Sequence, residues 1–320
     1  MLILYIIIIN IVSNMNLISI VVPCYNEEET IKPFYREITK VFNSLDDEAE
    51  IIFINDGSTD NTLDEIKKTG AKYISFSRNF GKEAALFAGL EKSKGDYVIV
   101  MDVDLQDPPE LIPEMIGIIK KEDFDVVGTR RVSRKGEPAI RSFFARAFYR
   151  LMNRVSDTHL VDGARDYRIM TRQVTDAILS LREYNRFSKG LFEWVGFRTK
   201  WLEYENVERV AGETSWSFWG LFKYSIEGIV GFTTAPLSIS TLLGIIFSIV
   251  AFLLIVFVVI RNLLFSDPVQ GWTSTVCIIL LLGGIQLLSI GILGKYLEKT
   301  YTEVKKRPIY LVKESNIDDD

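Results

Sequence analysis

Two side chains that carry much enzyme chemistry are nearly absent from this sequence. His159 is the only histidine, and Cys24 and Cys277 are the only cysteines, in 320 residues. A single histidine argues against Ser-His-Asp catalysis and excludes a histidine-rich metal site. One cysteine lies at a predicted strand end and the other in an apolar helix. They form no disulfide framework or zinc site, which fits a reducing compartment.

Glycine-rich phosphate loops are also missing. The sequence contains no Gly-x-x-x-x-Gly-Lys-Ser/Thr segment, and no Gly-x-Gly-x-x-Gly follows the first predicted strand. A nucleotide bound here would therefore be held by carboxylates and a metal rather than by a glycine cradle. The net charge of −5 gives no global signal for nucleic acid, which we do not expect as a partner.

Residues 16–210 read as a soluble α/β domain. Short apolar runs alternate there with helical patterns, which predicts a mostly parallel sheet covered by helices. The predicted strands cover residues 17–22, 50–54, 73–76, 97–101, 124–129 and 199–205. Ligands of such sheets bind beyond the carboxyl ends of the strands. Asp56, Lys82, Asp102 and Asp104 fall at or just after such ends, so we expect them to share one site.

An acidic pair follows the run Tyr97–Met101, and two prolines then stop the strand. Because side chains alternate across a strand, Asp102 and Asp104 are expected on one face. Two carboxylates at a strand end suit Mg²⁺ or Mn²⁺ bound together with a substrate diphosphate. Asp-x-Asp is frequent by chance, however, and the plain alternative is a polar strand end that enters a solvated loop.

Two apolar runs near the C-terminus predict a membrane hairpin. Residues 236–262 and 271–295 each exceed the ~20 residues that a spanning helix needs. Lysines and an arginine flank the pair, and the linker between the runs carries one Arg and one Asp. The positive-inside rule then predicts an integral protein of the plasma membrane, with its soluble domain and tail (296–320) in the cytoplasm.

Four further segments carry weaker signals. Residues 1–15 are apolar but too short to span, so we expect a mis-assigned start or an extension that is disordered or touches the membrane. The charged stretch 161–168 is predicted to lead into a helix at 171–181. The aromatic segment 213–235 predicts an interfacial helix. The basic, aromatic segment 130–154 fits either contact with an anionic membrane surface or an ordinary amphipathic helix.

Several spaced motifs occur together and in order. They are Val-Val-Pro23-Cys-Tyr25-Asn-Glu27, Asn55-Asp56-Gly-Ser-Thr-Asp, Ser-Arg78-Asn-Phe-Gly-Lys82-Glu, Asp102-Val-Asp104-Leu-Gln-Asp-Pro-Pro-Glu, Asp166-Tyr-Arg168 and Arg186-Phe-x-Lys-Gly-Leu. With the hairpin, they resemble the family 2 glycosyltransferases of GT-A fold, in particular the membrane-anchored group that glycosylates polyprenyl phosphates. The resemblance covers residues 16–307 and implies a GT-A catalytic domain at 16–212. Asn55 stands where many relatives carry Asp, which weakens any inference about the base.

This resemblance implies roles for individual residues. The residues expected at the nucleotide sugar are Pro23, Tyr25, Glu27, Asp56, Lys82 and Asp102. Asp102 and Asp104 are expected to hold Mg²⁺ or Mn²⁺, and the catalytic residues are expected to be Asp104, Asp166 and Arg168. Arginines expected at the lipid phosphate are Arg131, Arg141, Arg146 and Arg150.

The implied reaction is an inverting, metal-dependent transfer of a sugar from a nucleotide sugar to undecaprenyl phosphate. UDP-glucose or UDP-N-acetylglucosamine is the expected donor, and the sequence allows a homo-oligomer. Two alternatives stay open: a processive polysaccharide synthase, and a non-catalytic membrane-tethered scaffold that binds nucleotide sugars. Two spans and the lack of Gln-x-x-Arg-Trp disfavour the first, and the intact Asp102 and Asp104 disfavour the second.

Overall fold

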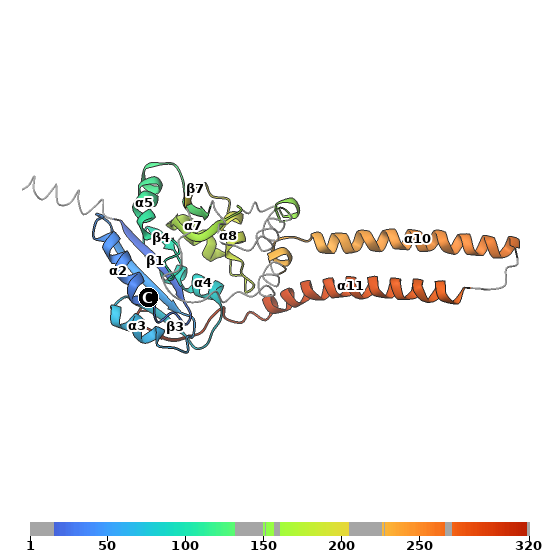
Figure 1. The fold of residues 1–320 in the computed structure, drawn as a ribbon, viewed down its shortest axis with the longest axis horizontal. Helices are drawn as coiled ribbons and strands as arrows, with labels where there is room; N and C mark the ends of the chain where they lie inside the picture. The colour runs from blue at the N-terminus through green and yellow to red at the C-terminus, as the bar shows by residue number, and fades with distance from the viewer. Residues whose placement is uncertain are drawn as a thin grey trace, which may run out of the picture.

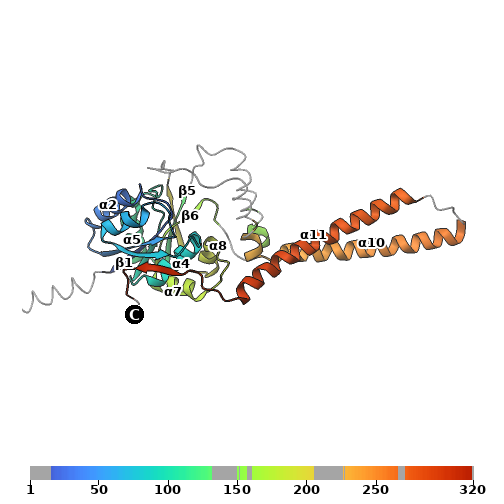
Figure 2. The same ribbon diagram turned by 90° about the horizontal axis from the view of Figure 1, so that it is seen from below.

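The structure is a computed structural model that describes residues 16–131, 150, 152–156, 161–204, 226, 228–265 and 271–318. It consists of an α/β domain from which two long helices project as a hairpin (Figures 1 and 2). The predictions for residues 1–15, for Arg141 and Arg146, and for most of the segment 213–235 lie outside the described residues.

One eight-stranded sheet forms the centre of the α/β domain, in the order β7-β5-β6-β4-β1-β2-β3-β8. The strands are β1 (Leu17–Cys24), β2 (Glu48–Asn55), β3 (Lys72–Phe76), β4 (Tyr97–Val100), β5 (Val126–Arg131), β6 (Ala164–Thr171), β7 (Thr199–Tyr204) and β8 (Val312–Ser315). The pairs β1–β2, β1–β4, β2–β3 and β5–β7 are parallel, whereas β3–β8, β4–β6 and β5–β6 are antiparallel. The predicted α/β class is therefore confirmed, with a sheet that is mixed but mainly parallel.

Helices cover both faces of this sheet (Figure 1). They are α2 (Ile31–Phe42), α3 (Thr62–Thr69), α4 (Lys82–Lys92), α5 (Ile112–Lys121), α7 (Arg172–Ser180) and α8 (Ser188–Trp194), with a 3₁₀ turn, η1, at Pro109–Leu111. Successive residues of β1 point to opposite faces: Ile20 packs in the core with Phe34 of α2, and Val21 packs with Leu86 of α4. Burial on both faces explains why the strands read as continuous apolar runs.

The acidic loop differs from its prediction. Strand β4 ends at Val100, so Asp102 and Asp104 lie in the following turn and strand alternation does not place them. Leu105 has a φ of 55°, in the left-handed region, where the chain turns toward η1.

Two strands of the sheet differ from the sequence-based expectation. The charged stretch 161–168 continues into β6, which lies between β4 and β5 in the sheet. The C-terminal tail returns to the α/β domain and adds β8 beside β3.

The hairpin consists of α10 (Ala235–Phe265) and α11 (Trp272–Val304). Ala235–Arg261 and Ile278–Val304 are long and apolar enough to cross a membrane, with mean hydropathies of 3.3 and 2.0. The apolar side chains described along both helices are largely exposed, as expected for helices whose surroundings are lipid. Both helices extend beyond the predicted spans 236–262 and 271–295, and α11 does so at its charged end.

Candidate active site

A lysine and two aspartates form the centre of the site. Lys82, the first residue of α4, places its Nζ 2.6 Å from Oδ1 of Asp102 and 2.6 Å from Oδ2 of Asp166. Burial alone would lower the pKa of Lys82, but the two carboxylates outweigh it and raise that pKa above its usual value. Burial would raise the pKa of Asp166, yet Lys82, Lys189 and Arg168 hold it well below its usual range. Lys82 and Asp166 are therefore both charged at neutral pH.

Asp56 fixes the backbone of the loop that precedes Lys82. Its side chain is buried, and its two carboxylate oxygens accept hydrogen bonds from the backbone N–H groups of Phe80 (2.6 Å) and Gly81 (2.9 Å). Burial raises the pKa of Asp56, although these hydrogen bonds and Arg78 oppose the shift. Gly81 has a φ of 97°, a backbone conformation that glycine adopts without strain. Asp56 therefore has a structural role in this loop, and its contact with the nucleotide base stays a prediction.

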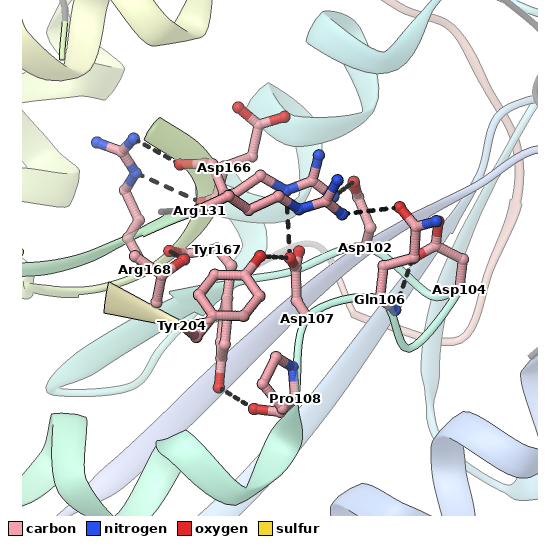
Figure 3. A network of polar contacts seen from close by, with 12 residues as sticks. Asp102, Asp104, Gln106, Asp107, Pro108, Arg131, Asp166, Tyr167, Arg168 and Tyr204 are labelled. Atoms are coloured by element: carbon pink, nitrogen blue, oxygen red, sulfur yellow. Dashed lines mark hydrogen bonds and ion pairs between the residues drawn. The ribbon is translucent and has the colours of Figure 1, made fainter. Parts of the chain in front are cut away.

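The acidic loop continues to Gln106, a residue that the sequence did not single out. Asp104 is buried, and its Oδ1 accepts a hydrogen bond of 3.1 Å from the backbone N–H of Gln106. The amide oxygen of Gln106 accepts a 2.9 Å hydrogen bond from Nη2 of Arg131 (Figure 3). Gln106 thereby links the acidic loop to one arginine predicted to bind lipid phosphate.

The side chains of the acidic loop fit a divalent cation that is also bound by the oxygens of a substrate diphosphate. Carboxylate and amide oxygens are donors that Mg²⁺ and Mn²⁺ accept. No cluster of three His, Cys, Asp or Glu side chains suited to a metal occurs among the described residues. Asp102 is also shared between Lys82 and Arg165, whose Nη2 lies 3.9 Å from Oδ2. A cation here would thus need diphosphate oxygens to complete its shell.

A buried polar network of Asp107, Arg165 and Tyr204 supports the loop that carries Asp102 and Asp104. Asp107 is 1% exposed, and its Oδ1 lies 3.2 Å from Nε of Arg165 and accepts a hydrogen bond from the Tyr204 hydroxyl (Figure 3). Burial raises the pKa of Asp107, which Arg165 opposes. Burial disfavours charge on Arg165 as well, but Asp107 and Asp102 outweigh it and raise its pKa. Asp107 therefore holds Arg165 beside Asp102, an arrangement that sequence spacing did not reveal.

Arg168 contacts backbone and aromatic groups beside this cluster rather than its carboxylates. Its side chain is 1% exposed, its guanidinium lies 3.8 Å from the ring centroid of Phe192, and its Nη2 donates to the carbonyl oxygen of Arg165 at 3.0 Å. Burial lowers its pKa. In this arrangement Arg168 supports the backbone of β6 next to Asp166, and its predicted catalytic role stays a prediction.

The remaining predicted residues lie around the end of β1. Pro23 is within β1, paired with Ile54 of β2, and Tyr25, 47% exposed, follows the strand. Tyr25 borders a cavity of about 580 Å³ that is also lined by Asn55 and Arg78. Glu27 belongs to the adjoining turn, where its side chain accepts a hydrogen bond of 3.1 Å from Thr30. These positions lie at the carboxyl end of β1, and their contact with a nucleotide sugar stays a prediction.

Comparison with known proteins identifies the family. Residues 19–179 match the family model Glycosyl transferase family 2. Over 301 residues, the chain is 42% identical to the bactoprenol glucosyl transferase of Shigella phage SfV and 41% identical to the prophage bactoprenol glucosyl transferase homolog of Escherichia coli K12. Each match covers 92% of this chain and 98% of the relative.

Solved structures give more distant likenesses. Glucosyl-3-phosphoglycerate synthase from Mycobacterium tuberculosis, solved with Mn²⁺, UDP-glucose and phosphoglyceric acid, is 20% identical, with a TM-score of 0.47 over 68% of this chain and 78% of that one. Mannosyl-3-phosphoglycerate synthase from Rubrobacter xylanophilus is 17% identical, with a TM-score of 0.48 over 67% and 72%. The family match and the relatives above carry the assignment: the chain belongs to glycosyl transferase family 2 and is a glycosyltransferase of GT-A fold.

Proposed function

We propose that this protein transfers a sugar from a nucleotide sugar to a polyprenyl phosphate at the membrane surface. The proposal rests on one observation: the same chain contains the charged Lys82–Asp102–Asp166 cluster and a helical hairpin long enough to span a bilayer. Relatives named bactoprenol glucosyl transferase, matched over 98% of their length, support a lipid acceptor. The donor we propose is UDP-glucose or UDP-N-acetylglucosamine.

The charges of the site suit a departing diphosphate. Lys82 and Arg165 lie beside Asp102, and cations near a developing negative charge stabilise the transition state. Asp102 and Asp104, with Gln106 near them, would hold Mg²⁺ or Mn²⁺, which supplies Lewis-acid stabilisation of the leaving diphosphate when bound. Attack by the acceptor from the face opposite the leaving group gives inversion.

The acceptor needs little help from a base. A phosphate monoester has a second pKa near ~6, so a polyprenyl phosphate is mostly a dianion at neutral pH. Asp166, whose pKa is held below its usual range, is a weak proton acceptor. We therefore assign Asp166 to orienting Lys82 and the acceptor rather than to general-base catalysis.

We propose that the hairpin holds the site at the membrane surface, where a lipid acceptor can reach it. Lys295, Lys299, Lys305 and Lys306 lie in the final turns of α11 or just beyond them. By the positive-inside rule, this end faces the cytoplasm, and the α/β domain to which the chain returns lies on the same side. We propose a plasma-membrane protein with a cytoplasmic catalytic domain.

A transfer assay with lipid extraction tests this function. Purified protein in detergent is given undecaprenyl phosphate, Mn²⁺ or Mg²⁺, and one radiolabelled nucleotide sugar at a time. Label that enters the organic phase with one donor identifies both reaction and sugar. Label in a polymer would indicate a processive synthase. Nucleotide-sugar binding without any transfer would indicate a scaffold.

Asp166→Asn should lose part, not all, of the activity. The amide keeps the shape of the side chain but removes the negative charge that holds Lys82, so we expect kcat to fall about ten- to a hundredfold. The pH dependence of kcat should keep its form, because Asp166 is ionised across the working range. Initial rates from pH 6 to 9 check this, and wild-type turnover would exclude Asp166 from the mechanism.

Of the four arginines predicted at the lipid phosphate, Arg150 is the one that is both described and exposed, and it tests binding of that phosphate. Arg150→Gln should raise KM for the lipid about three- to tenfold, since an exposed charge-assisted contact contributes ~1 kcal/mol, and should leave KM for the donor unchanged. Arg36→Gln, at a 76% exposed side chain on α2, is the control. An unchanged lipid KM in Arg150→Gln would exclude this residue from the lipid site.

A further inference from the structure

The C-terminal strand is joined closely to the edge of the catalytic sheet. Strand β8 pairs antiparallel with β3, Ile74 facing Ser315 and Phe76 facing Val312. Tyr310 stacks on Phe76 with ring centroids 4.9 Å apart and an interplanar angle of 20°. Figure 2 shows this strand, in red, lying against the α/β domain. The segment behaves as part of the domain rather than as a free tail.

Further contacts fix the register of this strand. The Glu314 carboxylate lies 2.6 Å from Nζ of Lys67 and accepts a 2.7 Å hydrogen bond from the Tyr73 hydroxyl. Just before β8, the carbonyl oxygen of Leu311 accepts a 3.0 Å hydrogen bond from the backbone N–H of Ser77. Because Ser77 begins the loop that ends at Lys82, the C-terminal segment supports the loop that enters the active site.

Lys313 faces the opposite way from Glu314, as strand alternation requires, and borders the cavity beside Tyr25. The other walls come from Tyr25 after β1, from residues 55–64 at the end of β2 and the start of α3, and from residues 75–79 at the end of β3. The last two segments pack closely. A Cβ atom on Gly57 would lie 2.3 Å from the backbone of Arg78. The volume of about 580 Å³ lies within the range of small-molecule sites. Four chain segments, including one from beyond the hairpin, thus enclose it.

The polar side chains of the cavity differ in their availability. Asp60 is already used, since its oxygens accept hydrogen bonds from Thr62 and from the backbone N–H of Glu28. Arg78 lies 3.9 Å from the ring centroid of Phe80 and donates to the carbonyl oxygen of Asn79. Among the described residues, none forms an ion pair with Lys313. Its ammonium group is available to a ligand with oxygen acceptors.

We propose that Lys313 binds the nucleoside end of the sugar donor, so that the strand after the membrane hairpin completes the donor pocket. This inference rests on the proposed use of a nucleotide sugar. The cavity lies at the ends of β2 and β3, on the side of the sheet away from β5–β7, whereas Asp102 and Asp104 follow β4. The base and ribose therefore reach Lys313, while the diphosphate reaches the acidic loop. Residues 305–311 alone separate α11 from β8, which links donor binding to the membrane anchor.

Binding of UDP and UMP to the full-length protein in detergent tests this proposal without requiring turnover. Lys313→Ala should lower the affinity for UDP and for UMP by the same factor, about three- to tenfold, because the lost contact is to the nucleoside that both ligands contain. Lys313→Arg should retain most of the affinity. Lys121→Ala, at an exposed position at the end of α5, is the matched control.

The outcomes separate this inference from the proposed function. In the transfer assay, Lys313→Ala should raise KM for the donor and leave kcat and the lipid KM unchanged. Unchanged nucleotide affinity in an active enzyme would overturn the role of Lys313 alone. A loss that is larger for UDP than for UMP would overturn its placement at the nucleoside. Failure of the wild-type protein to bind any nucleotide would instead overturn the proposed function.

Discussion

Asp104→Asn should lower sugar transfer about a thousandfold, the largest catalytic loss that we expect from a single side chain. The side chain is buried in the loop after β4, where we propose that its carboxylate holds a cation together with Asp102. Loss of several kcal/mol of charge stabilisation corresponds to about this factor in rate. The measurement is kcat at saturating donor and lipid, with the Mn²⁺ dependence of the rate recorded beside it.

The asparagine variant keeps the hydrogen-bond acceptor for Gln106, so the loop should stay folded. Asp123→Asn is the matched control, because its side chain is 92% exposed and lies outside the site. The control should behave as wild type, and the Mn²⁺ concentration for half-maximal rate should rise only in Asp104→Asn. Near-normal transfer by that variant at low Mn²⁺ would remove Asp104 from the cation site.

The apolar strands were predictable from sequence because each is buried on both faces and bounded by turn residues. Strand β6 was not, since Arg165, Asp166 and Arg168 give it the appearance of a solvated loop. Each of those charges is compensated by groups from distant elements, such as Lys82 on α4 and Phe192 on α8. Such partners cannot be read from the local pattern.

The same limit applies to the site. The edge at which Asp56, Lys82 and the acidic pair gather was predictable, because ligands of parallel sheets bind at the strands' carboxyl ends. The contact between Lys82 and Asp166 was not, since it depends on the antiparallel insertion of β6 beside β4. The sequence pattern does not predict strand β8, because this strand is four residues long and carries Lys313 and Glu314, as is typical of a charged edge strand.

Arg165→Met should destabilise the catalytic domain by about 3 kcal/mol, the largest stability loss expected of a substitution in the site. The Asp107 side chain, which is 1% exposed, would stay buried but would lose the Arg165 guanidinium that lies 3.2 Å from its Oδ1. Removing one partner of a buried ion pair leaves an uncompensated charge, which is far more destabilising than removing both. The hydrogen bond from Tyr204 would remain but cannot neutralise the carboxylate. The measurement is the free energy of unfolding from denaturant titration in detergent.

A second substitution identifies the cause. Arg165→Met combined with Asp107→Asn should recover more than about half of the lost stability, because the buried carboxylate is gone and a double-mutant cycle isolates the pair. Arg36→Met, at an exposed site, should change stability by less than about 0.5 kcal/mol. Additive losses in the double variant would show that Arg165 acts through packing alone. Recovery of stability without recovery of transfer would assign to Arg165 a separate role beside Asp102, where its Nη2 lies 3.9 Å from the carboxylate.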